Sequence, residues 1–164
     1  IRTEVPFGHH VETLKLPRRL VTRSEKEWAQ AQVDRVLAKP AAKRSSAEES
    51  HRRWNQHVID RFKEQQANPK FDMELHVLRL GDVAVATNPF ELFLDFGLRM
   101  KTQSKAQQTF IVQLTGSAGW YLPTVKAAAG GGYSAIIQSS LVGPEGGDVL
   151  VNRTVELINA MGAK

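Results

Sequence analysis

The chain has 164 residues, of which 41% are apolar and 24% charged, and it contains no cysteine. A chain of this length usually forms one domain with a substantial core. Without cysteine it can form no disulfide and cannot use a thiol for catalysis. Its longest apolar run, residues 83–96, is interrupted by polar residues and falls short of the roughly 20 residues that a membrane helix needs. We therefore expect a single domain or fragment over residues 1–164, with no transmembrane segment.

The net charge of +5 is concentrated in the first part of the chain. Residues 1–70 hold 15 Lys and Arg against 9 Asp and Glu, whereas residues 71–164 hold 7 against 8. Such a basic segment could meet phosphate groups or an anionic membrane surface. The basic residues alternate with acids, however, and no nucleic-acid motif accompanies them. We expect solvated helical faces and no nucleic-acid partner, and a peripheral membrane contact stays open.

Two helices with strong start signals are predicted in residues 1–69. Each start resembles a capping box, in which a serine and a glutamate three residues later satisfy each other's free amides; the two segments are residues 24–27 and 46–49. Trp28 and Trp54 follow at helical spacing with other apolar residues, so we expect both to anchor a core. Pro40 and Pro69 end the two helices. Residues 1–69 are thus predicted to form a helical, basic front part.

Residues 70–164 change to short β-prone runs separated by helical patterns. Two runs around Gly81-Asp82 predict a hairpin, and Asn88-Pro89 predicts the start of a helix that continues to about residue 101. Residues 109–114 and 133–138 predict further strands, with a long Gly- and Ala-rich stretch between them, and Asp148 is predicted to cap a last helix. The order α-α-β-β-α-β-β-α indicates an α/β (α+β-like) fold in which helices cover a small mixed β-sheet.

Three short motifs follow one another in the second part of the chain, and together they resemble the C-terminal part of neutral (non-lysosomal) ceramidases. In that family a strand leads to a Pro-Gly-Glu turn, a second strand to a Tyr-containing segment, and a glycine-rich stretch to another tyrosine. The corresponding residues here are Pro89-Phe90-Glu91, Tyr121-Leu122-Pro123-Thr124 and Gly130-Gly131-Gly132-Tyr133. Phe90 departs from the family's glycine, and Ser134 from the glutamate that usually follows the last tyrosine. The resemblance covers residues 70–164.

The resemblance implies a zinc-dependent amidohydrolase that cleaves an N-acyl bond with a zinc-activated water. Carried over by position, Glu91 and Tyr121 would be two zinc ligands, and Gly130, Gly131, Gly132 and Tyr133 would bind substrate or form a lid. The family's two histidine ligands lie upstream, so we expect a missing N-terminal catalytic domain and no activity of this chain alone. The resemblance also implies an N-acyl lipid or another amide as substrate, and a secreted or periplasmic location.

Other interpretations of the same residues stay open at the level of sequence. Asn88, Pro89 and Glu91 also fit an ordinary helix start, with Asn88 as the cap. Asp95 and Arg99, one helical turn apart, predict an ion pair. None of the five histidines has a recognised ligand spacing. A non-catalytic α/β module that binds a protein partner or an anionic surface through its basic helices is the alternative to an enzyme fragment.

Overall fold

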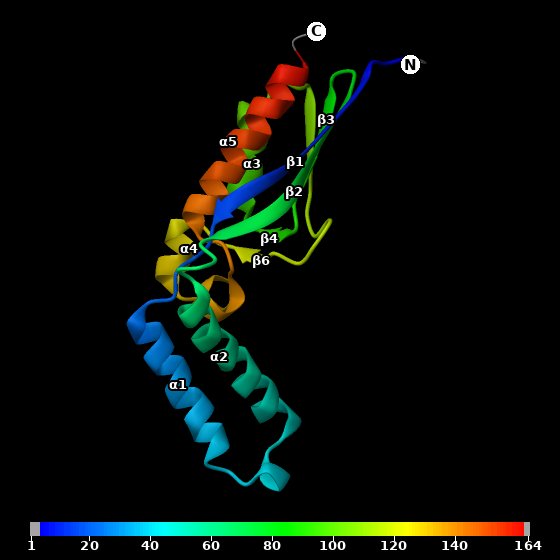
Figure 1. Cartoon of the computed structure of the whole chain (residues 1–164). Coiled ribbons are helices and arrows are strands. Elements are labelled where there is room, and N and C mark those ends of the chain that lie inside the picture. The colour runs from blue at the N-terminus through cyan, green and yellow to red at the C-terminus, as the bar shows by residue number, and fades with distance from the viewer. Residues whose placement is uncertain (1–3, 163–164) are drawn as a thin grey trace.

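The computed structural model describes residues 4–162, which form a four-stranded sheet, two helices against one of its faces, and a separate helical hairpin (Figure 1). The sheet has the order β1-β2-β3-β5, with antiparallel pairs except for β3 and β5, which run parallel. Its strands are β1 (Phe7–Pro17), β2 (Lys70–Leu80), β3 (Val83–Thr87) and β5 (Gln108–Val112). The predicted α/β class with a small mixed sheet is confirmed.

Helices α3 (Leu94–Gln103) and α5 (Pro144–Met161) pack on the sheet and enclose the larger core. Alternate residues of β2 and β3 point into this core, because successive side chains of a strand face opposite ways. They meet apolar side chains of the two helices, such as Phe96, Leu150 and Ile158. The helix α5 begins at Pro144, earlier than the predicted Asp148.

The helical hairpin consists of α1 (Arg23–Leu37) and α2 (Ser46–Glu64), and it extends away from the sheet (Figure 1). Both capping boxes are present, but they begin one or two residues earlier than predicted, with Thr22 and Ser45 as the caps. A second, smaller core lies between the two helices, and Ile137 from the distant C-terminal part completes it. Trp28 is about half exposed, so the prediction that it anchors the core is wrong.

Strand β1 is the main element that the sequence did not reveal. Residues 1–69 were expected to be helical, yet Phe7–Pro17 pairs with β2 along its full length. The strand's inward positions include His10 and Glu12 beside Leu14 and Leu16, and these polar residues hide the alternation that normally indicates a strand. The Arg153 side chain of α5 donates two hydrogen bonds to the Glu12 carboxylate, at 2.6 and 2.7 Å, and thereby ties β1 to the helix layer.

The Glu12–Arg153 ion pair predicts a specific loss of stability in acid. Hydrogen bonds from Arg153 lower the pKa of Glu12 from 4.5 to about 2. Because the folded-state pKa is below the unfolded one, the ionised carboxylate stabilises the fold above pH 4.5, and this contribution disappears as the pH falls towards 2. Urea unfolding between pH 6 and 2 should show a steeper loss for the wild type than for Glu12→Gln. Asp72→Asn, in an exposed pair with Lys15, should keep the wild-type slope.

Smaller elements connect the sheet to the hairpin. They are β4 (Phe90–Leu92), β6 (Trp120–Leu122), α4 (Val125–Gly130) and the 3₁₀ turns η2 (Tyr133–Ala135) and η3 (Ile137–Ser139). A further 3₁₀ turn, η1 (Ala41–Lys43), lies between α1 and α2 within the hairpin. The predicted strand over residues 133–138 is therefore wrong. The predicted Asp95–Arg99 pair is also wrong, because the Arg99 guanidinium bonds the Asp148 carboxylate of α5 at 2.6 Å. Among residues 4–162, no helix is both long enough and apolar enough to cross a membrane.

Candidate functional site

The two predicted metal ligands lie side by side on a pair of very short strands. Strands β4 and β6 run parallel, and their register places Glu91 opposite Tyr121. The neighbours Phe90, Leu92 and Leu122 are buried in the core, whereas Glu91 and Tyr121 are only partly buried. Since side chains alternate along a strand, the pair faces away from the core. The two short strands thus present a carboxylate and a phenol together.

Asn88 sets the direction in which β4 leaves the sheet. Its side-chain oxygen accepts a hydrogen bond from the Phe90 amide at 3.1 Å, and its backbone N–H donates to the Val112 carbonyl of β5 at 2.9 Å. Asn88 is almost completely buried. It therefore organises a turn between β3 and β4 and does not cap a helix, because α3 begins only at Leu94. The interpretation of Glu91 as part of a helix start is wrong.

The backbone before Tyr121 has a shape that few sequences tolerate. A Cβ atom on Gly119 would lie 2.4 Å from the Phe90 ring, so only glycine fits there. Trp120 has a φ of 58°, in the left-handed region that bulky residues rarely adopt. Backbone strain of this kind is concentrated at functional sites, where the surrounding structure maintains it. Gly119 and Trp120 were not identified from the sequence as parts of the site.

The Glu91 carboxylate changes the acidity of Tyr121. A hydrogen bond to Glu91 is the main cause that raises the pKa of the Tyr121 hydroxyl, and desolvation and the negative charge of Glu91 add to the effect. The hydroxyl donates to the carboxylate, and this interaction favours the protonated phenol. The carboxylate and the phenol together present oxygen atoms that are potential ligands for a cation.

This interaction can be measured on the protein itself, because the chain has only two tyrosines, Tyr121 and Tyr133. We expect an absorbance titration of tyrosinate formation in Tyr133→Phe to give a midpoint above the ordinary value of about 10. The additional change Glu91→Gln should return the midpoint towards 10, since the charged acceptor is lost. An unchanged midpoint in the double variant would show that the two side chains do not interact.

Aromatic rings surround the Glu91–Tyr121 pair. The Tyr133 ring lies 6.0 Å from the Tyr121 ring in an edge-to-face arrangement and 5.9 Å from the ring of Trp54 on α2. A cavity of about 180 Å³ lies between them, lined by Trp54, Glu91, Trp120, Tyr121, Tyr133, Gln138 and Ser139. The hairpin therefore contributes Trp54 to the site, although the sequence suggested only a core role for it.

Side chains from the hairpin, and that of Arg19 just before it, hold the segment that carries Tyr133 and Gln138. The indole N–H of Trp54 donates to the Gln138 carbonyl at 3.1 Å, and the Arg61 guanidinium donates to the Ile137 carbonyl at 2.7 Å. Arg19 donates to the Ala135 carbonyl at 2.6 Å. The segment has no regular strand partner over these residues, so the side chains satisfy its backbone oxygens. The position of the site's outer wall thus depends on the hairpin.

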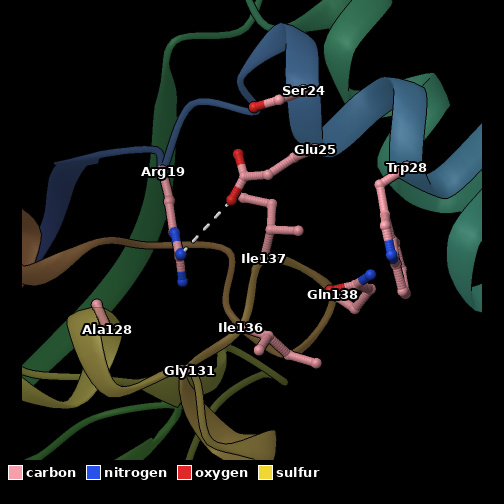
Figure 2. Close-up of a pocket in the computed structure, with 9 residues that line it drawn as sticks. All are labelled: Arg19, Ser24, Glu25, Trp28, Ala128, Gly131, Ile136, Ile137 and Gln138. Carbon is pink, nitrogen blue, oxygen red and sulfur yellow. Dashed lines mark ion pairs between the residues drawn. The ribbon is translucent and has the colours of Figure 1, made fainter.

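A larger, mostly apolar cavity of about 490 Å³ lies between α1 and this segment (Figure 2). Trp28, Ile136 and Ile137 supply much of its apolar wall, and the Arg19–Glu25 ion pair, at 3.7 Å, lies on one side. Gln138 lines both this cavity and the smaller one. The two cavities are therefore neighbours.

The glycine-rich motif, residues 130–133, contributes one residue to the lining of each cavity. Gly131 ends α4 with a φ of 68°, a left-handed conformation that favours glycine, and it lines the larger cavity. Gly130 and Gly132 are exposed, with open space where a Cβ atom would lie. Tyr133, which follows, is 69% exposed while its ring contacts the smaller cavity. The structure places Tyr133 beside Glu91 and Tyr121, and the role of the glycines as a lid stays a prediction.

The histidines of the described residues do not join this site as a metal-binding group. Within residues 4–162, no three His, Cys, Asp or Glu side chains gather in a cluster that could hold a metal ion. His57 packs edge-on against Trp120, with ring centroids 5.1 Å apart, and burial lowers its pKa. His9 and His76 lie on the sheet and share a hydrogen bond of 3.0 Å.

Comparison with known proteins gives similarity at the level of structure. No known family profile matches the sequence, and no curated protein matches it. The crystal structure of a neutral ceramidase from Pseudomonas aeruginosa is similar with a TM-score of 0.50 and 17% sequence identity, over 56% of this chain and 15% of that chain. A ceramidase complexed with C2 matches with a TM-score of 0.49 and 16% identity, over 55% of this chain and 15% of that chain.

The match to the Pseudomonas aeruginosa enzyme shows a shared fold over about half of this chain. The chain spans only 15% of the length of either ceramidase. The predicted resemblance to neutral ceramidases is confirmed at this level: about half of the chain has a ceramidase-like fold.

Proposed function

We propose that this chain is part of a ceramidase-like amidohydrolase and supplies Glu91 and Tyr121 as two ligands of a catalytic zinc ion. The observation that carries the proposal is the pairing of Glu91 with Tyr121 on parallel strands at a cavity, within a ceramidase-like fold. The residue roles come from the resemblance in sequence, and the pairing supports them because it brings both oxygen atoms to one place. The reaction is hydrolysis of an N-acyl bond.

The donor set suits zinc in part. Zinc accepts carboxylate and phenolate oxygens, and a catalytic site normally has three or four protein ligands with an open position for water. Glu91 and Tyr121 supply two donors, so the remaining ligands would come from another part of the polypeptide. When bound, zinc would polarise the amide carbonyl and lower the pKa of a bound water to about 7. The Glu91 charge attracts the cation, and the proton of the Tyr121 hydroxyl must leave if the phenolate binds.

The cavities fit an amide that carries an apolar chain. Tyr133, Trp54 and Trp120 form aromatic walls around the Glu91–Tyr121 pair, and the neighbouring cavity beyond Gln138 has apolar walls from Ile136 and Ile137. Apolar walls with few polar groups are typical of sites for small lipophilic ligands. An N-acyl lipid or a related amide is therefore our proposed substrate. A secreted or periplasmic location remains a prediction from the resemblance.

The alternative of a module that binds an anionic surface is less well supported. Many basic side chains of the hairpin already have acidic partners, as in the pairs Arg23–Glu27 and Arg44–Glu49. Arg61 is buried and bonds backbone carbonyls. These contacts leave less unpaired positive charge on the hairpin than the composition suggests.

The test is N-acyl hydrolysis by the protein expressed from its native start, with and without a zinc chelator. The substrates would be short-chain ceramides and simple N-acyl amines. We expect cleavage that the chelator stops and that added zinc restores. Cleavage that is indifferent to the chelator, or no cleavage of any substrate by protein that contains zinc, would contradict the proposed function.

A further inference from the structure

One face of the main sheet is apolar and uncovered in the described residues. Helices α3 and α5 both lie against the opposite face (Figure 1). The strand register defines the uncovered face as three rows that cross the sheet, which we call the open face: Phe7, Leu80, Val83 and Gln108; His9, Leu78, Val85 and Phe110; Val11, His76, Thr87 and Val112. Eight of these twelve side chains are apolar.

The apolar side chains of the open face are strongly exposed to solvent, and they adjoin one another rather than being scattered over the surface. Phe7 is 64% exposed, Phe110 50% and Val11 45%. Contiguous apolar patches of this kind mark interaction sites on soluble proteins. Towards the far end of β1 and β2 the face becomes polar, and an exposed ion pair joins Lys15 to Asp72. An apolar centre with a polar margin is the usual composition of a protein–protein contact.

The side-chain pattern of β3 also indicates that a second layer covers this face. The strand is apolar on both sides: Ala84 and Ala86 point into the core, whereas Val83 and Val85 belong to the open face. A strand with one solvated face would normally carry polar residues at the positions of Val83 and Val85.

We infer that the open face docks against the histidine-bearing remainder of a longer polypeptide. This inference rests on the proposed function, which requires further zinc ligands. The neutral ceramidase with a similar fold leaves ample chain for such a layer, since the present chain covers 15% of it. The three rows of the open face contain no Lys, Arg, Asp or Glu, and the adjoining row carries the acidic Glu74, which bonds His76 at 2.7 Å. The open face therefore suits an uncharged apolar protein layer better than a phosphate-rich surface.

The location of the open face suits the delivery of metal ligands. Thr87 belongs to its last row, and Glu91 follows only four residues later through the Asn88 turn. Four residues span at most roughly 14 Å. A protein layer that covers the row of Thr87 and Val112 therefore reaches the vicinity of Glu91 and Tyr121, where it could supply further metal ligands. Docking on the hairpin would not place histidines along this edge of the sheet.

Hydrogen exchange tests this inference without any need for catalysis. Exchange of the β5 amides would be compared between the 164-residue chain and the protein expressed from its native start. We expect at least about tenfold slower exchange in the longer protein, because a buried sheet opens less often. Phe110→Asp should remove this protection in the longer protein, since it places an unpaired charge in the contact. Trp28→Asp, an equally exposed site on α1, should keep it.

The competing explanation is that a second copy of the same chain covers the open face. Light scattering of the 164-residue chain tests it, because a second copy would make the chain a dimer. A monomer whose β5 becomes protected only in the longer protein supports the inference. A dimer with β5 already protected, a reading frame that adds no further domain, or equal exchange in both proteins would overturn it. Amide hydrolysis is scored separately: protection without activity would refute only the proposed function, and activity without protection only the docking.

Discussion

Replacing Glu91 with glutamine in the full-length protein is expected to lower zinc-dependent amide hydrolysis by about a hundredfold or more. Loss of a group that merely orients a zinc ligand already costs about 10- to 100-fold in affinity or activity. Glutamine keeps the shape of the side chain but removes the negative charge that attracts the cation and accepts the hydrogen bond of Tyr121. The change should appear both in turnover and in the zinc content of the purified protein.

The fold of Glu91→Gln should be unchanged, because the side chain is only partly buried and points away from the core. We expect its free energy of unfolding to stay within about 0.5 kcal/mol of the wild type. Asp95→Asn is the matched control: it removes the same charge from an exposed position on α3, one turn beyond the site. Wild-type activity and zinc content in Glu91→Gln would refute the metal role of Glu91.

The resemblance in sequence placed Glu91 and Tyr121 in one site, and the structure brings them side by side, whereas the secondary structure predicted around Glu91 was wrong. Strands β4 and β6 have three residues each, too few for a period-2 pattern to appear. Asn88 and Pro89 carried a strong helix-start signal, yet the Asn88 side chain bonds the Phe90 amide within a turn. The helix-start signal is overridden because Asn88 is buried and its backbone N–H bonds the Val112 carbonyl of the neighbouring strand β5. The resemblance of motifs located the pair because it did not depend on these local rules.

Elements with a long, regular pattern were predicted well. The hairpin of β2 and β3 around Gly81 follows from two apolar runs and a turn, and Gly81 has the left-handed φ of 57° that the turn needs. The contribution of the helical hairpin to the site was not predictable in this way. Trp54 meets Tyr133, 79 positions later in the chain, through a three-dimensional contact that no local pattern encodes.

Arg61→Met is expected to destabilise the protein by about 2–4 kcal/mol and to disturb the wall of the candidate site. Arg61 is 7% exposed and donates hydrogen bonds to the carbonyls of Ile137 at 2.7 Å and Arg19 at 3.0 Å. Methionine fills a similar space but leaves both carbonyls unsatisfied, and each hydrogen bond from a charged donor contributes about 1.5–3 kcal/mol. The gain from no longer burying a charge offsets part of this loss, since burial lowers the pKa of Arg61 to about 10.

Chemical denaturation measures this change in the free energy of unfolding. Tryptophan fluorescence, compared with that of the corresponding Trp54→Phe variant to isolate the contribution of Trp54, reports on the wall beside Tyr133. Arg53→Met on the exposed side of the same helix is the control, because Arg53 is exposed and donates a hydrogen bond to the Ser50 hydroxyl on the surface. It should change stability by no more than about 0.5 kcal/mol. Equal stability of the two variants would mean that the hairpin does not hold residues 135–138 in place. A selective loss in Arg61→Met would show that a buried cation, bonded to carbonyl oxygens, joins the hairpin to the segment that bears Tyr133.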